Sequence, residues 1–149
     1  MFFIIFLSNI LINVDHGTLP GCRDQIEKKL NVKDFEYGIL GSLVYVGLTL
    51  GSAFATGLFS KGEYIKPTLV VTLLLNAVSL FLFTMTSSFI MISPIRLMIG
   101  FFQIFTCIFY PVWCDTYGPE RYKSAWLTIM LLASPLGIVL GYALTYYMN

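Results

Sequence analysis

The stretch Pro67–Met85, which reads PTLVVTLLLNAVSLFLFTM, contains no charged side chain. A lipid bilayer has a hydrocarbon core of about 30 Å, and a helix needs roughly 20 mostly apolar residues to cross it. The stretch therefore predicts a transmembrane helix. Four further stretches are of similar length and mostly apolar, and they predict four more helices: Phe2–Pro20, Tyr37–Phe59, Ile90–Val112 and Ser124–Tyr146. The predicted fold is all-α and integral to the membrane, with about five helices in a single bundle over residues 1–149.

The composition supports lipid as the solvent. Of the 149 residues 57% are hydrophobic and 11% are charged, whereas soluble domains carry about 25% charged residues to keep their surface wet. Nine basic and eight acidic residues give a formal net charge of +1. The basic residues are scattered, so a nucleic-acid partner is excluded. The three cysteines form no C-x-x-C pair, so we expect no metal and no cofactor.

The charged residues lie mainly between the apolar stretches. The connection of residues 21–36 reads GCRDQIEKKLNVKDFE and is long enough for a short surface helix. An excess of Lys and Arg normally marks the cytoplasmic loops. Here each side would receive four: Lys61, Lys66, Arg121 and Lys123 on one, and Arg23, Lys28, Lys29 and Lys33 on the other. Charge alone does not orient the chain or identify its membrane.

Polar side chains inside the predicted spans are the candidate functional residues. A charge at mid-bilayer costs roughly 2.5–3.5 kcal/mol on insertion scales, so it needs a partner, water or a function. Asp15 and Arg96 are such charges. On the first span Asn9, Asn13 and His16 share one helix face with the spacing i, i+4, i+7. On the fourth, a polar stripe runs through Arg96, Gly100, Gln103, Cys107 and Tyr110.

A third polar stripe follows the second span through Ser42, Tyr45, Thr49, Ser52 and Thr56. Three helices with polar faces predict a shared hydrated cavity, lined by Asn13, Tyr45, Thr49 and Tyr110. We expect Asp15, His16, Arg96 and Gln103 to handle protons or a solute there. Gly100 would leave room for a partner beside the Arg96 guanidinium. The alternative is that Asp15 and Arg96 form a structural ion pair at the membrane surface, and that the hydroxyls only hydrogen-bond between helices.

Small residues predict where helices pack closely. Gly47-x-x-x-Gly51 and Ala133-x-x-x-Gly137-x-x-x-Gly141 let two backbones approach each other. Pro135 lies within the second of these motifs and removes a backbone hydrogen bond, which predicts a kink in the fifth span.

Taken in chain order, these motifs resemble the first five helices of a major facilitator superfamily transporter. Gly57–Lys61 (GLFSK), followed by Gly62 and Lys66, resembles the loop motif between helices two and three, although the family usually has Asp where Ser60 stands. The resemblance implies that Asp115 is the acidic partner of this gating loop and that Lys61 can pair with it. Three other segments resemble motifs of the family in helices four, five and one: Arg96–Gly100, Ser134–Gly141 and, in Spinster-like members, Asn13–Gly17.

The resemblance implies transport of a small solute by alternating access. Asp15 would accept a proton, and Arg96 would be its charge partner or a substrate clamp. The family has two six-helix halves with the solute site between them, so five helices suggest a truncated chain. The expected partners are a C-terminal half, the lipid bilayer, a solute and protons. The alternative is a non-transporting membrane protein that is inactive alone or needs a second half. No G-x-S-x-G or H-E-x-x-H occurs, so we expect no enzyme.

Overall fold

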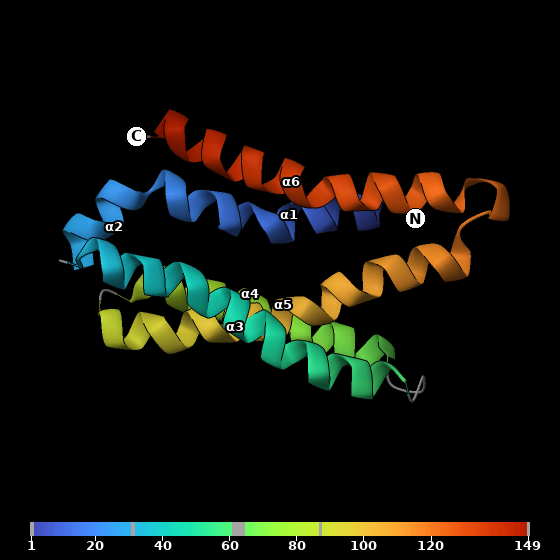
Figure 1. Ribbon diagram of the computed structural model, residues 1–149, viewed down its shortest axis with the longest axis horizontal. Coiled ribbons are helices and arrows are strands. Elements are labelled where there is room, and N and C mark those ends of the chain that lie inside the picture. The colour runs from blue at the N-terminus through green and yellow to red at the C-terminus, as the bar shows by residue number, and fades with distance from the viewer. Residues whose placement is uncertain (1, 31, 61–64, 87, 149) are drawn as a thin grey trace. The chain divides into compact units, whose positions relative to one another are not determined.

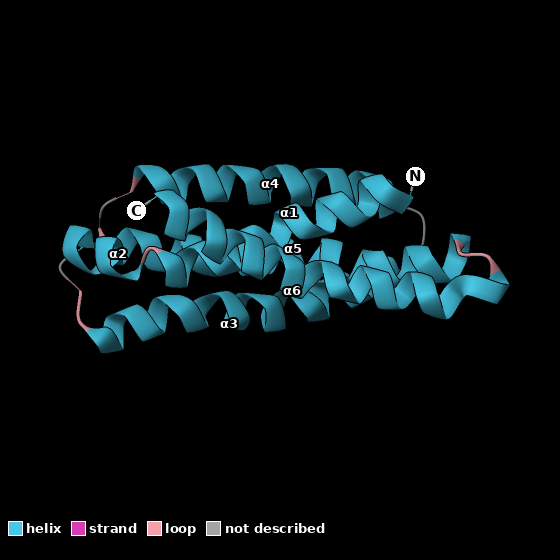
Figure 2. Ribbon diagram, turned by 90° about the horizontal axis from the view of Figure 1, so that it is seen from above, coloured by secondary structure: helices cyan, strands magenta, loops and turns pink. Residues whose placement is uncertain are grey.

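The computed structural model describes residues 2–30, 32–60, 65–86 and 88–148. Five long helices account for most of them: α1 Phe2–Gly21, α3 Asp34–Phe59, α4 Ile65–Met85, α5 Phe89–Tyr117 and α6 Lys123–Met148 (Figure 1). Each of these helices is long and apolar enough to cross a membrane. For α6 the apolar span includes the η1 turn before it. The described residues contain no strand, as Figure 2 also shows. The prediction of an all-α membrane fold with five spanning helices is confirmed.

Short elements fill two of the connections. The helix α2, Arg23–Leu30, occupies the polar segment in which a surface helix was expected. The 3₁₀ turn η1, Glu120–Tyr122, precedes α6. At the start of α3, the backbone N–H of Lys33 donates to Glu36 Oε2 at 2.9 Å. This bond satisfies a backbone donor ahead of the first turn, and the helix begins at Asp34, earlier than the expected Tyr37.

The chain divides into two compact units: unit 1 comprises Met1–Arg23 and Phe109–Asn149, and unit 2 comprises Asp24–Ile108. The single bundle over residues 1–149 stays a prediction.

In unit 1, α1 packs along α6. The two helices run parallel, because contacts advance along both together: Phe2 meets Trp126, Gly17 meets Ile138 and Gly21 meets Thr145. Glycines allow the close approach. A Cβ added at Gly17 or at Gly141 would overlap backbone atoms of the other helix. At one end, the side chains of Trp113, Cys114 and Met130 form a buried cluster.

In unit 2, α3 packs along α5, again in parallel. A Cβ added at Gly47 would overlap the backbone of Leu97, and one at Gly100 would overlap that of Val44. Each helix therefore brings a glycine to the other's backbone at this crossing. The ring pairs Phe54–Phe101 and Phe59–Phe105 flank it, with centroids 5.6 and 6.2 Å apart. The helix α4 contacts α5 where Phe83 lies against Arg96.

Candidate functional site

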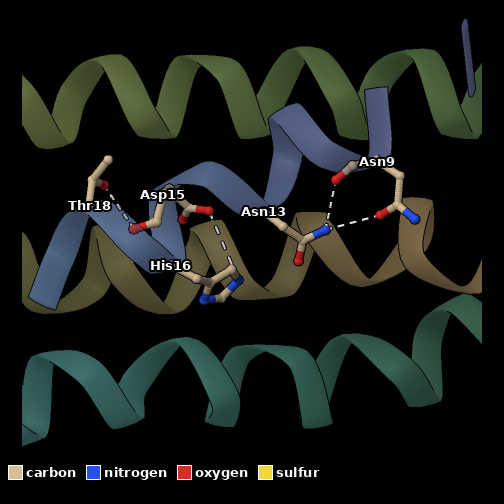
Figure 3. Close-up of polar contacts among 5 residues, drawn as sticks. All are labelled: Asn9, Asn13, Asp15, His16 and Thr18. Atoms are coloured by element: carbon tan, nitrogen blue, oxygen red, sulfur yellow. Dashed lines mark hydrogen bonds and ion pairs between the residues drawn. The ribbon is translucent and has the colours of Figure 1, made fainter. Parts of the chain in front are cut away.

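The polar face of α1 is partly used to bind α6. The Asn9 amide Nδ2 donates to the Met130 carbonyl at 2.9 Å. The Asn13 amide Nδ2 donates to the Asn9 carbonyl at 2.8 Å and to Asn9 Oδ1 at 3.0 Å, as Figure 3 shows. Both side chains are buried. Asn13, expected to line a cavity, thus orients Asn9, and Asn9 holds α1 to α6.

Asp15 and His16 lie further along α1. The distance between His16 Nε2 and Asp15 Oδ1 is 3.9 Å (Figure 3). The Asp15 side chain is 13% exposed and the His16 side chain is 14% exposed. The Thr18 hydroxyl donates to the Asp15 backbone carbonyl at 2.9 Å. At their separation, Asp15 and His16 attract each other as an ion pair when the imidazole carries a proton, but 3.9 Å is longer than a hydrogen bond. Their expected role in handling protons or a solute stays a prediction.

Arg96 is buried in α5, with 3% of its surface exposed. Its guanidinium carbon lies 4.0 Å from the centre of the Phe83 ring on α4. An aromatic face attracts a cation, and the attraction reaches about 2 kcal/mol where water is excluded. The ring therefore helps to compensate for taking the guanidinium out of water. Gln103, two turns further along the same helix, is also buried.

Gly100 does not leave room beside Arg96, and this expectation is wrong. The space a side chain would fill at Gly100 is taken by the Val44 carbonyl of α3. The glycine is needed because the two helix backbones touch there, so its role is in packing.

The polar stripe of α3 faces outward in unit 2. Tyr45 is 62% exposed, and Thr49 is exposed as well. The Thr49 hydroxyl donates to the Tyr45 carbonyl at 2.9 Å. Three more hydroxyls of this helix also bond to carbonyls of α3 itself: Ser42, Ser52 and Thr56. Hydroxyls satisfied in this way need no partner helix. The shared cavity, which draws on α1 as well, stays a prediction.

Tyr110, the fourth expected cavity residue, is buried in unit 1. Its hydroxyl lies 3.1 Å from Ser8 Oγ on α1. Because the Ser8 hydroxyl donates to the Ile5 carbonyl at 2.8 Å, the Tyr110 hydroxyl is the donor between the two. The residue links the start of α1 to the second half of α5.

The residues expected to serve in gating or helix packing lie in different surroundings: some are at the surface and others are at a helix crossing. Lys61 lies outside the described residues, so its pairing with Asp115 stays a prediction. The Asp115 carboxylate accepts from Lys123 Nζ at 3.3 Å at the protein surface. A Cβ at Gly57 would meet nothing within 4 Å. Gly137 and Gly141 lie against the backbone of α1, and α6 continues as a helix through Pro135.

Sequence reasoning missed a polar face on α4. Thr72, Asn76 and Ser79 are buried, although the stretch that contains them looks uniformly apolar. Their spacing of i, i+4 and i+7 places them on one side of the helix and was the signal that could have revealed them. Thr106 on α5 is buried too. Among the described residues, no three His, Cys, Asp or Glu side chains gather as metal ligands.

The sequence was compared with protein families and with known proteins, and it is similar to members of one family. The family model described as Major Facilitator Superfamily matches residues 1–149. Two curated relatives come from Arabidopsis thaliana. The protein named probable sphingolipid transporter spinster homolog 1 is 26% identical over 124 residues, which are 83% of this chain and 25% of the relative. The protein named probable sphingolipid transporter spinster homolog 3 is 26% identical over 148 residues, 94% of this chain and 28% of the relative.

The chain thus spans about a quarter of the length of the curated relatives it matches. No solved structure matches it.

Proposed function

The chain belongs to the major facilitator superfamily, and on this basis we propose that it forms part of a carrier that moves a small solute across a membrane by alternating access. It is a multi-pass membrane protein with five apolar helices. Solute identity, coupling to protons and the assembly of both units into one bundle are parts of the proposal. So is a second half of the carrier as partner.

The observation that carries the proposal is the buried cation at Arg96. A charged side chain inside a membrane-spanning helix is costly, and such residues mark ion or solute pathways by default. Arg96 is 3% exposed and rests on the Phe83 ring. A purely structural arginine near a helix end would extend its side chain to the membrane surface. Burial within the protein supports a role in binding a solute or a carboxylate.

The second part of the proposal is proton coupling through Asp15. Its carboxylate and the His16 imidazole lie together, and both are largely covered. A nearby guanidinium favours the ionised form of a carboxylate, and loss of that contact favours the protonated form. A carrier that brings Asp15 and Arg96 together in one conformation and separates them in another would couple proton release to the conformational change.

The test is uptake into proteoliposomes under an imposed pH gradient. The names of the two relatives make tritiated sphingosine the first solute to try. We expect Asp15→Asn to abolish the dependence of uptake on the gradient and Arg96→Leu to abolish uptake itself. The matched control is Asp24→Asn, because Asp24 is an exposed carboxylate on α2 and its loss should leave uptake unchanged. Gradient-driven uptake that persists in Asp15→Asn would contradict the proton-coupling role.

A further inference from the structure

The side of α6 that does not meet α1 is apolar and exposed. Its exposed side chains include Leu131, Leu136, Val139 and Leu144. After Lys123, its first residue, α6 carries no charged side chain. An exposed apolar surface of this extent marks a contact with a protein or with a membrane. The residues at its two ends show which contact it makes.

Aromatic rings that carry a polar atom bound this face at both ends. Trp126 lies near the start of α6, and the exposed Tyr122 precedes it in η1. Tyr146 and Tyr147 lie at the end of α6, are exposed, and have ring centroids 5.9 Å apart. Trp and Tyr are enriched at both membrane–water interfaces, because the ring is apolar while its N–H or O–H group bonds to water and headgroups. This residue pattern is typical of a surface that contacts lipid.

The spacing of the rings matches the thickness of a bilayer. Trp126 and Tyr146 are 20 residues apart, which is about 30 Å along a helix that rises about 1.5 Å per residue. The hydrocarbon core of a bilayer is also about 30 Å thick. The average tilt of a spanning helix, about 20°, shortens the projected length by only about 2 Å. The outward face of α6 therefore has the length that lipid chains would cover.

Contacts between α1 and α6 give the level of Asp15 along this face. A Cβ added at Gly137 would lie 2.8 Å from Asn13 Cβ. A Cβ added at Gly141 would lie 3.1 Å from Gly17 Cα. Because Asp15 lies midway between Asn13 and Gly17 on α1, it is level with the midpoint of Gly137 and Gly141 on α6.

That midpoint is Val139, which lies seven residues before Tyr146, or about 10 Å along the helix. An aspartate side chain is too short to carry its carboxylate across this distance, unlike the long stems of Lys and Arg. We propose that the outward face of α6 contacts lipid, with the aromatic rings at its two ends in the two headgroup layers. Asp15 then lies at the depth of the hydrocarbon core, about 10 Å from the Tyr146 layer.

This placement is incompatible with an ion pair of Asp15 at the membrane surface. It holds whether or not Asp15 takes part in transport, so its test needs no solute.

The first test measures depth by tryptophan fluorescence. The full chain is reconstituted in phosphatidylcholine vesicles whose lipids carry bromine either just below the headgroup or near the chain ends, because bromine quenches a ring close to it. In a background of Trp113→Phe with Trp126→Phe, a single tryptophan replaces Leu136, Val139 or Tyr146. All three side chains are exposed, so these three replacements disturb no buried contact.

Each position has its own expected ratio. Leu136 lies midway between Trp126 and Tyr146, so Leu136→Trp should be quenched severalfold more by the deep bromines than by the shallow ones. Tyr146→Trp should show the reverse. Val139→Trp, at the level of Asp15, should resemble Leu136→Trp.

The matched control is Ser124→Trp, at an exposed position just before Trp126, which should show the shallow preference of Tyr146→Trp. A shallow preference in Val139→Trp, equal ratios in Leu136→Trp and Tyr146→Trp, or a deep preference in Ser124→Trp would overturn the placement. Absence of quenching at Leu136→Trp and Val139→Trp would show that protein covers this face, and it would overturn the proposal too.

The second measurement needs no substitution and does not depend on how well a variant folds. The chain has two tryptophans, Trp113 and Trp126, whose rings stack with centroids 5.9 Å apart. Both therefore report on the end of unit 1 where α6 begins. In the unsubstituted chain, we expect the shallow bromines to quench this fluorescence more than the deep ones. Equal quenching, or stronger quenching by the deep bromines, would contradict the assignment of this end to a headgroup layer.

Discussion

At the crossing of α1 and α6 in unit 1, Gly141 meets the backbone of Val14, and Gly17 meets that of Ile138. At the crossing of α3 and α5 in unit 2, Gly47 meets the backbone of Leu97. Both crossings thus join parallel helices through glycines, but different side chains accompany them. In unit 1 the Asn9 amide donates to a carbonyl of α6, whereas in unit 2 aromatic rings pack edge to face.

Close packing through glycine is therefore common to both units, although the side chains beside the glycines are polar in one unit and aromatic in the other. In lipid, no hydrophobic force draws helices together, so close backbone contact and hydrogen bonds must do so. Unit 1 uses part of its polar face for adhesion and keeps Asp15 and His16 on the same helix. Unit 2 uses rings for adhesion, and its buried polar groups, including Arg96, lie elsewhere on α4 and α5.

The largest expected effect comes from filling a glycine contact. Gly141→Leu places a side chain where Val14 backbone atoms lie, and overpacking of this kind costs about 3 kcal/mol. SDS titration followed by circular dichroism measures the loss. Gly57→Leu is the control, because a Cβ there meets open space and surface substitutions change stability by about 0.5 kcal/mol or less. Equal stability of the two variants would show that the crossing does not depend on glycine.

A smaller effect is expected from removing the amide of unit 1. Asn9→Leu loses the bond to the Met130 carbonyl and leaves the Asn13 amide without the Oδ1 acceptor. We expect a loss of about 1.5 kcal/mol in the same titration. Leu11→Val on the exposed side of α1 should change little. If Asn9→Leu is as stable as the wild type, the polar contact does not hold the crossing.

The corresponding variant in unit 2 is Phe101→Leu. It removes the ring that contacts Phe54 and Phe105, with centroids 5.6 and 5.9 Å away. Because aromatic pairs contribute about 0.5–1.5 kcal/mol beyond their buried area, we expect a loss of about 1 kcal/mol. Phe81→Leu, at an exposed ring on α4, is the control. If the loss is no greater than that of the control, the ring contacts of Phe101 do not stabilise the crossing of α3 and α5.

The smallest effect is expected at the surface pair of Asp115 and Lys123. The Asp115 side chain is 76% exposed, and exposed ion pairs contribute about 0–1 kcal/mol. Asp115→Asn should therefore lower the free energy of unfolding by less than about 0.5 kcal/mol, and added salt should remove the difference. A loss well above this value would point to another, better-shielded partner for Asp115.

Much of the fold was predictable because each helix is recognisable on its own. Lipid cannot bond to backbone groups, so an apolar stretch of sufficient length must form a helix. The glycine motifs of the second and fifth spans were found from spacing alone. The expected role of Gly100, however, was wrong: it was expected to leave space beside Arg96, but it packs against another helix. Its sequence neighbours Arg96 and Gln103 suggested a polar opening, whereas its actual neighbour is Val44 on another helix.

The candidate site was predicted less completely. Asp15, His16 and Arg96 stand out because ionisable residues are rare in apolar stretches, and the structure gives each a buried or largely covered position. Tyr45 and Thr49 have the same polar signal but are exposed. Asn76 and Thr106 were overlooked, because a single amide or hydroxyl among leucines and phenylalanines is too common in spans to single out.

The amino-acid sequence by itself determined the solvent, the number of spanning helices and the residues whose polarity needs an explanation. These properties depend on hydropathy and on hydrogen bonds within one helix, which are local. Tertiary structure alone decided that Asn9 serves adhesion, that Gly100 meets Val44, and that Phe83 supports Arg96. Such contacts depend on the rotation and register of one helix against another, which are set by the fit of side chains distant in sequence.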